Sequence, residues 1–296
     1  MGWTGLILVS AVFLALYDLA KKASVRENAV LPVLLCSSTC GLIAFTLALA
    51  AAGRLGVVAA ADGVTLALAA AKAVIVSTSW IFTFCGLRTL PITIATPIRA
   101  SSPAFVFLIA FFLYGEVPSW GQALGMLLVF GGYWAFSWAG RHEGIDFFRN
   151  RAVWFALAGM CFSTVSSLFD KFVFQVVAPQ KEAVQFYFQV GLVVVYGLLL
   201  VGRTALKMRH DRFEWRWTIP FVGTLLAVAD WFFFASIAHP GVPISVCSLM
   251  RRFSVVLTFL LGAKFFHETN LRRKAIALVF ILTGIGLLTV GGDVLK

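Results

Sequence analysis

Long apolar stretches, separated by short polar segments, recur ten times along this chain of 296 residues. Each stretch is long enough to cross the roughly 30 Å of hydrocarbon in a bilayer as a helix. The pattern therefore predicts an all-α polytopic membrane protein with ten transmembrane helices. The predicted spans are 3–20, 29–52, 63–87, 91–114 and 119–139 in the first half, and 152–175, 183–202, 217–238, 243–266 and 271–290 in the second.

The composition agrees with this class. Hydrophobic residues make up 60% of the chain and charged residues 12%, with a mean hydropathy of +0.93, whereas soluble domains carry about 25% charge. The longest connections, 140–151 and 203–216, are polar and basic and too short for a folded domain. Only Met1 and Gly2 precede the first span, so we expect insertion without a cleaved signal peptide.

The two halves of the chain share a register. Charged residues and prolines recur at an offset of 152 residues, as in the pairs Asp18 and Asp170, Arg99 and Arg251, Glu116 and Glu268, and Pro91 and Pro243. Five spans per copy is an odd number, so the second copy enters the membrane from the opposite side. The sequence predicts two inverted five-helix repeats, residues 1–140 and 141–296, a plan that many secondary transporters use. A rigid membrane scaffold made by duplication is the alternative.

The segment PITIATPIRASSPAFVFLIAFFLYGE, residues 91–116, and its counterpart PISVCSLMRRFSVVLTFLLGAKFFHE, residues 243–268, carry a family signature. They resemble the fourth-span motif of the EamA-type transporters of the drug/metabolite transporter superfamily. The resemblance implies ten spans, two EamA-like repeats and transport of a small solute by alternating access. The chain departs from the family pattern at His267, at the double arginine 251–252 and at the triplet Leu-Tyr-Asp of 16–18.

The basic residues are unevenly divided between the two sides of the predicted bundle. The loops after spans 1, 3, 5, 7 and 9, together with the first turn of the span 271–290, hold 15 Lys and Arg residues, and the opposite side holds three. The positive-inside rule makes the basic side cytoplasmic, which puts both termini outside. The net charge of +11 thus reports topology and attraction to anionic membrane lipids. Nucleic-acid binding is not expected, because no basic patch lies on a soluble module.

Two acid–base pairs are predicted inside the membrane, where a charged side chain costs at least about 2.5–3.5 kcal/mol and needs a partner or a water-filled path. Asp18 and Arg99 share a depth near the cytoplasmic side, and Asp170 and Arg251 share one near the outside. One pair at each mouth suits the gates of an alternating-access carrier. Permanent structural bridges are the alternative.

Lys72 and Asp230 lie at equal depth near the midplane and break the repeat, since their counterparts are Thr224 and Thr78. Carriers of this build bind their substrate near the midplane. We therefore predict that Lys72 and Asp230 contact the cargo or the coupling ion, with an inert ion pair between them as the alternative.

Further residues complete the predicted substrate site. Arg99 and Arg251 contribute positive charge, and polar stripes on the spans indicate a lined path. The aromatic side chains of Tyr17, Trp80 and Trp231 are expected to pack on an apolar part of the cargo, and Gln189 to line the same path.

The charge of the cargo follows from a comparison of intramembrane cations and acids. Arginine favours carboxylate and phosphate, so the excess of cations predicts a small anionic or zwitterionic organic metabolite. The cations are Lys72, Arg99, Lys171, Arg251 and Arg252, and the acids are Asp18, Asp170 and Asp230. A coupling proton or a counter-substrate would supply the energy, because the sequence has no ATP-binding motif.

Other functions stay open at this stage: a lipid-linked headgroup flippase, an amino-acid or drug exporter, or a non-transporting subunit or sensor. We expect no enzyme, cofactor or metal site, because hydrolase and phosphate-binding motifs are missing and Cys36 and Cys40 are too few ligands for a metal. Glycines in spans 119–139 and 271–290 allow close packing or a homodimer. The expected location is a cell membrane, in bacteria the inner one.

Overall fold

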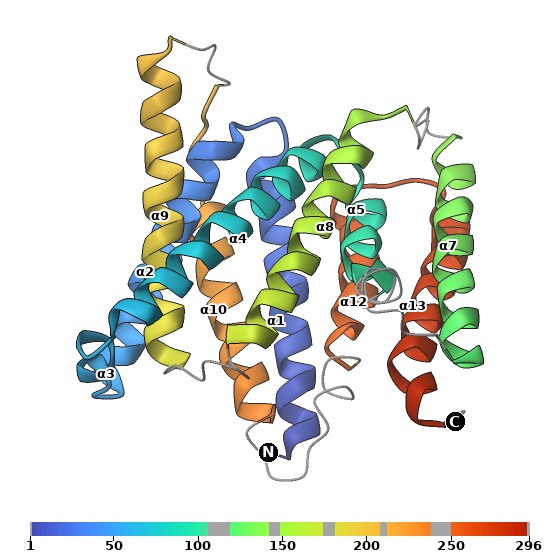
Figure 1. The fold of residues 1–296 in the computed structure, drawn as a ribbon. Coiled ribbons are helices and arrows are strands. Elements are labelled where there is room, and N and C mark those ends of the chain that lie inside the picture. Colours follow the sequence, from blue (N-terminus) through green and yellow to red (C-terminus); the bar gives the residue numbers. More distant parts are fainter. Residues whose placement is uncertain are drawn as a thin grey trace.

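The computed structural model describes residues 2–102, 104–105, 119–141, 149–173, 181–207, 212–237 and 250–294. Every regular element within these ranges is a helix (Figure 1). The first half contains α1 (Trp3–Val25), α2 (Val30–Ala51), α3 (Leu55–Ala59), α4 (Gly63–Thr89), α5 (Ile92–Ala100) and α7 (Trp120–Arg141). The second half contains α8 (Arg151–Phe172), α9 (Lys181–Ala205), α10 (Thr218–Ile237), α12 (Phe253–Phe265) and α13 (Leu271–Val294).

Each predicted span overlaps one of these helices. The short helix α3 was not predicted, because its five residues lie in the short connection between the predicted spans 29–52 and 63–87. By length and composition, α1, α2, α4 and most of α9 can cross a membrane, and shorter apolar helical segments occur in α8, α10 and α12. The chain is thus an all-helical, multi-pass membrane protein. The remainder of the predicted spans 91–114 and 243–266 lies largely outside the described residues, so ten spans stay a prediction.

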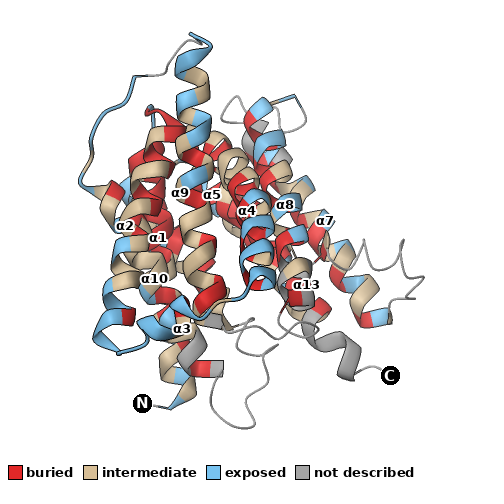
Figure 2. Ribbon diagram, turned by 60° about the vertical axis from the view of Figure 1, so that its left-hand side comes forward, coloured by how far each residue is buried: buried red, intermediate tan, exposed pale blue. Residues whose placement is uncertain are grey.

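The helices form a single bundle in which α2 and α9 lie at one end and α7 and α13 at the other (Figure 1). Figure 2 shows exposed positions on peripheral elements such as α3, while buried positions gather where the helices meet. Glycines allow two of the crossings. A Cβ atom at Gly223 of α10 would lie 2.2 Å from the carbonyl oxygen of Ser37 in α2, and one at Gly284 of α13 would lie 2.6 Å from that of Gly125 in α7.

The helix contacts form a matched set between the two halves. α1 packs on α10 and α8 packs on α4; α2 packs on α10 and α9 packs on α4. The pairs α2 with α9 and α7 with α13 join helices at the same position in each half, and α5 with α12 joins different parts of the matching predicted spans 91–114 and 243–266. An exchange of the halves therefore converts this set of contacts into itself.

Charged side chains fix the joint between α4 and α5. The ammonium of Lys22 donates to the carbonyl oxygens of Leu87 and Leu90, at 2.7 and 2.5 Å, and so caps the C-terminal end of α4. Glu268, which follows α12, accepts from the backbone N–H groups of Ile92 at 2.6 Å and Thr93 at 3.2 Å. A carboxylate at these unpaired N–H groups stabilises the start of α5.

A second cap lies outside the spans, at the start of α4. Asp62 accepts from the backbone N–H of Thr65 at 3.0 Å. Hydrogen bonds from the Thr65 side chain and backbone hold the pKa of the Asp62 carboxyl below its ordinary value.

Candidate functional site

The site forms where α5 ends and α12 begins. Pro97 lies inside α5 and has no N–H for the helical ladder. Near the end of α5 the backbone tightens, and the Ser101 N–H bonds to the carbonyl oxygens of both Pro97 and Ile98. The Ala100 carbonyl accepts from the Arg252 guanidinium at the start of α12. Because Glu268 reaches the other end of α5, the two helices run antiparallel.

The first group of charges, the Asp18 cluster, consists of Asp18, Lys21 and Arg99. One carboxylate oxygen of Asp18 pairs with Arg99 of α5, and the other accepts from the Lys21 ammonium at 3.1 Å. The Asp18 and Lys21 side chains are only 2% and 4% exposed, and that of Arg99 is 31% exposed. The Lys21 ammonium also lies 4.6 Å from the centre of the Tyr17 ring. Two cations thus compensate one buried carboxylate.

The second group, the Asp230 cluster, consists of Asp230 and Arg251. The carboxylate of Asp230 in α10 pairs with the Arg251 guanidinium at 2.5 Å. The two side chains are 29% and 19% exposed, and the guanidinium lies 4.5 Å from the centre of the Phe233 ring. The charges of this pair cancel, and both side chains are partly exposed.

Tyr17 of α1 lies beside the Asp18 cluster. Its ring is buried, and the Lys21 ammonium lies over it. Because α1 packs on both α10 and α12, the two clusters belong to one polar region inside the bundle.

The structure brings together part of the predicted gates. Asp18 and Arg99 pair as their common depth indicated, while their role as a gate stays a prediction. The side chain of Asp170 lies outside those that the structure describes, so its predicted pairing with Arg251 stays a prediction too. The described partner of Arg251 is Asp230.

Lys72 and Asp230 do not pair with each other. Lys72 of α4 is buried, and its ammonium lies 4.9 Å from the centre of the Phe188 ring of α9. Asp230 instead takes Arg251. The alternative of an ion pair between Lys72 and Asp230 rested only on their equal predicted depth in the membrane. The orientation of α10 places Asp230 beside Arg251 instead.

The remaining predicted site residues have different environments. Trp80 is partly buried against the core, whereas Trp231 is largely exposed and packs edge to face on Phe232. The side-chain oxygen of Gln189 is buried with no hydrogen-bond partner among the described residues. Trp231 thus lies apart from the buried polar region.

Sequence reasoning missed three buried cations. Lys21 and Lys22 were counted with the first cytoplasmic loop and Lys274 with the last, yet all three are buried. The spacing of Lys21 three residues after Asp18 was the available signal, because such residues are neighbours on a helix. Lys274 lies 3.9 Å from Glu268, a contact between segments that spacing does not reveal.

A narrow cavity lies at the Asp18 cluster. Its volume is about 10 Å³, which is at the lower limit for one water molecule. It is lined by Asp18, Lys21, Thr83, Leu87, Ile92, Ala95, Thr96, Arg99 and Ala156. The polar region is therefore closed at the Asp18 cluster, where there is no room for a solute larger than water. Among the described residues, no group of three or more His, Cys, Asp or Glu side chains could hold a metal ion.

Comparison with known proteins identifies the class. Residues 1–138 match the model of the EamA-like transporter family, which belongs to the drug/metabolite transporter superfamily. The resemblance predicted from residues 91–116 is thereby confirmed over residues 1–138, which are similar to a family of membrane transporters.

The fold has counterparts among solved structures. A crystal structure described only as that of a protein covers 97% of this chain and 96% of its own, with a TM-score of 0.64 and 18% identity. At this identity the likeness concerns the fold alone. A search of curated proteins gave no match.

Proposed function

We propose that this protein is a secondary transporter that moves a small anionic or zwitterionic organic metabolite by alternating access. The observation that carries the proposal is the pair of repeat-related arginines, Arg99 and Arg251. Each forms an ion pair with an aspartate of another helix, inside a bundle of apolar helices. Charges in such a position suit a solute path, because they are costly in a bilayer without a function.

Two inverted repeats, residues 1–140 and 141–296, are part of this proposal. The matched helix contacts support it, as does the bond between Arg252 and the carbonyl of Ala100. These residues are 152 positions apart, so each is the other's counterpart. Contact between counterparts is expected only at the axis that relates two copies. Inversion then gives two conformations that open to opposite sides.

The charge of the polar region supports an anionic cargo. The described cations Lys21, Arg99 and Arg251 of the two clusters outnumber the described carboxylates of Asp18 and Asp230. A bound carboxylate or phosphate group would reduce this excess, and arginine offers it two parallel hydrogen bonds. Lys72 and Asp230 stay our proposed specificity residues, with Tyr17 and Gln189 along the path.

The Asp18 cluster is proposed as the cytoplasmic gate, closed in this conformation, with both termini outside. The 10 Å³ cavity supports closure at that end. We propose that the partner gate at the other mouth uses Arg251, with Asp170 or Asp230 as its acid. The proposed location is a cell membrane, with a proton or counter-substrate as the driving species.

The test begins with purified protein and a thermal-shift screen of amino acids, organic acids, phosphorylated metabolites and cationic drugs. Each stabilising compound is then assayed as radiolabelled solute for counterflow in sealed proteoliposomes. We expect counterflow of an acid or zwitterion. Binding without counterflow for every stabilising compound would contradict a transporter and favour a sensor, and counterflow of cations alone would contradict the cargo class.

The gates are tested with a single reporter cysteine near the midplane in a cysteine-free background. Arg99→Ala and Arg251→Ala should change its labelling from the two sides of the membrane in opposite directions. If both variants lose folded protein equally and labelling keeps its sidedness, the pairs are structural bridges.

A further inference from the structure

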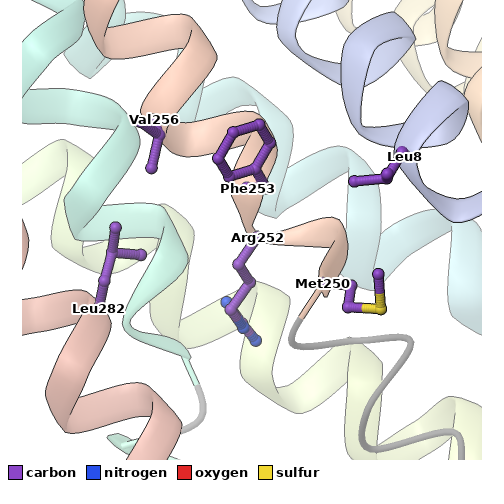
Figure 3. Close-up of a pocket in the computed structure, with 6 residues that line it drawn as sticks. All are labelled: Leu8, Met250, Arg252, Phe253, Val256 and Leu282. Atoms are coloured by element: carbon purple, nitrogen blue, oxygen red, sulfur yellow. The ribbon is translucent and has the colours of Figure 1, made fainter. Parts of the chain in front are cut away.

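A second cavity lies between α1, α12 and α13, apart from the Asp18 cluster. Its volume is about 320 Å³, and it is lined by Leu8, Met250, Arg252, Phe253, Val256 and Leu282 (Figure 3). Five of these side chains are apolar and one is cationic. Leu8 and Phe253 are close to half exposed, so the cavity opens between the helices toward the outside of the bundle.

The charge of Arg252 is uncompensated among the described residues. Its guanidinium has one hydrogen bond there, to the neutral carbonyl of Ala100, and its Nε is buried without a partner. The neighbouring Arg251, by contrast, is paired with Asp230. In Figure 3 the Arg252 guanidinium lies between Leu282 and Met250, below Phe253 and Val256. An arginine in apolar surroundings strongly favours an anionic partner.

We infer that this cavity binds a small monocarboxylate with a short apolar chain, its carboxylate on Arg252 and its chain against Leu8, Phe253 and Leu282. The combination of one cation with an apolar wall excludes two simpler ligands. An inorganic anion would leave the wall without a partner, and an uncharged hydrocarbon would leave the guanidinium without one.

The size of the cavity limits the ligand. Ligand pockets in proteins measure about 300–1,000 Å³, so 320 Å³ is near the lower end of that range. A single chain of the length of octanoate is suited to such a volume, whereas the two acyl chains of a phospholipid are not. The lateral opening suits a ligand that partitions into the bilayer before it binds.

The experiment measures binding of tritiated octanoate to the protein in phosphatidylcholine nanodiscs, with empty nanodiscs as background. We expect octanoate to compete at least about tenfold better than octanol or inorganic phosphate. Arg252→Met should weaken octanoate about tenfold or more, because a hydrogen bond to a charged group is lost. Arg252→Lys, which keeps the charge, should weaken it less.

Matched variants separate the cavity from other sites. Val256→Trp fills the cavity and should abolish binding, while Leu260→Trp, on the same helix and outside the lining, should preserve it. Arg99→Met should also preserve it. Loss of binding in Arg99→Met but not in Arg252→Met would place octanoate at the transport site, which overturns this inference and leaves the proposed transport function intact.

A photoreactive diazirine analogue of octanoate tests the unmodified protein, in case Arg252→Met does not fold. Mass spectrometry should find the label on Met250, Phe253 or Leu282. Labelling confined to other helices would overturn the assignment. So would displacement of octanoate by nanodiscs that contain an anionic phospholipid, because a lipid headgroup would then be the occupant.

Discussion

The Asp18 cluster and the Asp230 cluster use the same chemistry in opposite surroundings. Arg99 and Arg251 are repeat counterparts, and each pairs with an aspartate. Among the described residues, the carboxylate of Asp18 is 2% exposed and has two cations, whereas that of Asp230 is 29% exposed and has one. The number of compensating cations thus follows the degree of burial.

The difference has a physical reason. A carboxylate removed from solvent loses its hydration, and only close cations and hydrogen bonds replace it. Asp18 meets this requirement with Lys21 from its own helix and Arg99 from α5. The carboxylate of Asp230 stays partly exposed and loses less of its hydration, so the charge of one arginine is enough to compensate it. A transporter needs elements whose contacts can break and re-form, and the Asp230 cluster is the better suited of the two in this conformation.

The largest effect is expected from exchange of the charges within each pair. Asp18→Arg with Arg99→Asp places an arginine beside the buried Lys21 ammonium, so we expect no stable folded protein. Asp230→Arg with Arg251→Asp restores an ion pair with no third charge in the cluster, and should change the free energy of unfolding by about 1 kcal/mol. Size-exclusion profiles and unfolding in mixed micelles with SDS measure both.

Neutralisation of the acids should give the next effect. Asp18→Asn leaves the buried Lys21 and the partly exposed Arg99 without their anion and should lower the free energy of unfolding by about 3–5 kcal/mol. Asp230→Asn leaves one partly exposed arginine and should lower it by about 1 kcal/mol. Equal losses in the same unfolding assay would show that burial does not distinguish the two clusters.

Removal of Lys21 tests whether Asp18 needs its second cation. Lys21→Met keeps the Arg99 pair and the apolar stem of the side chain, but removes a hydrogen bond to a charged group, so a loss of about 2 kcal/mol is expected. Lys207→Met, at an exposed position just after α9, is the matched control and should change little. A Lys21→Met variant as stable as the unmodified protein would mean that Arg99 alone compensates Asp18.

The smallest effect concerns the cap that holds α5 beside the Asp18 cluster. Glu268→Gln keeps the shape of the side chain but removes the charge at the N-terminal N–H groups of α5, and should cost about 1 kcal/mol. Hydrogen exchange should rise at Ile92 and Thr93 and stay constant in α10. Uniform acceleration in both helices would contradict a local role of Glu268.

Part of the site followed from the sequence and part did not. Depth along two predicted spans was enough to pair Asp18 with Arg99, because both charges needed a partner at the same level of the membrane. Depth was not enough for Asp230: it offered Lys72 as the alternative partner and assigned Arg251 to Asp170, whereas the structure pairs Asp230 with Arg251. Which cation pairs with Asp230 depends on the rotation of α10 about its axis and on the helices that pack against it. The position of Asp230 along the sequence gives neither.

The sequence by itself determined the class of this protein, an all-helical membrane protein. Its apolar segments are long enough to cross a bilayer as helices, and each segment meets this length requirement independently of the others. The resemblance to the EamA-like family also followed from two segments, residues 91–116 and 243–268. Only the tertiary structure decided that Arg251 meets Asp230, that Glu268 caps α5 and that Arg252 reaches the carbonyl of Ala100. These contacts join residues far apart in the chain, and they depend on how each helix is turned in the bundle, which hydrophobicity fixes only weakly when most faces are apolar.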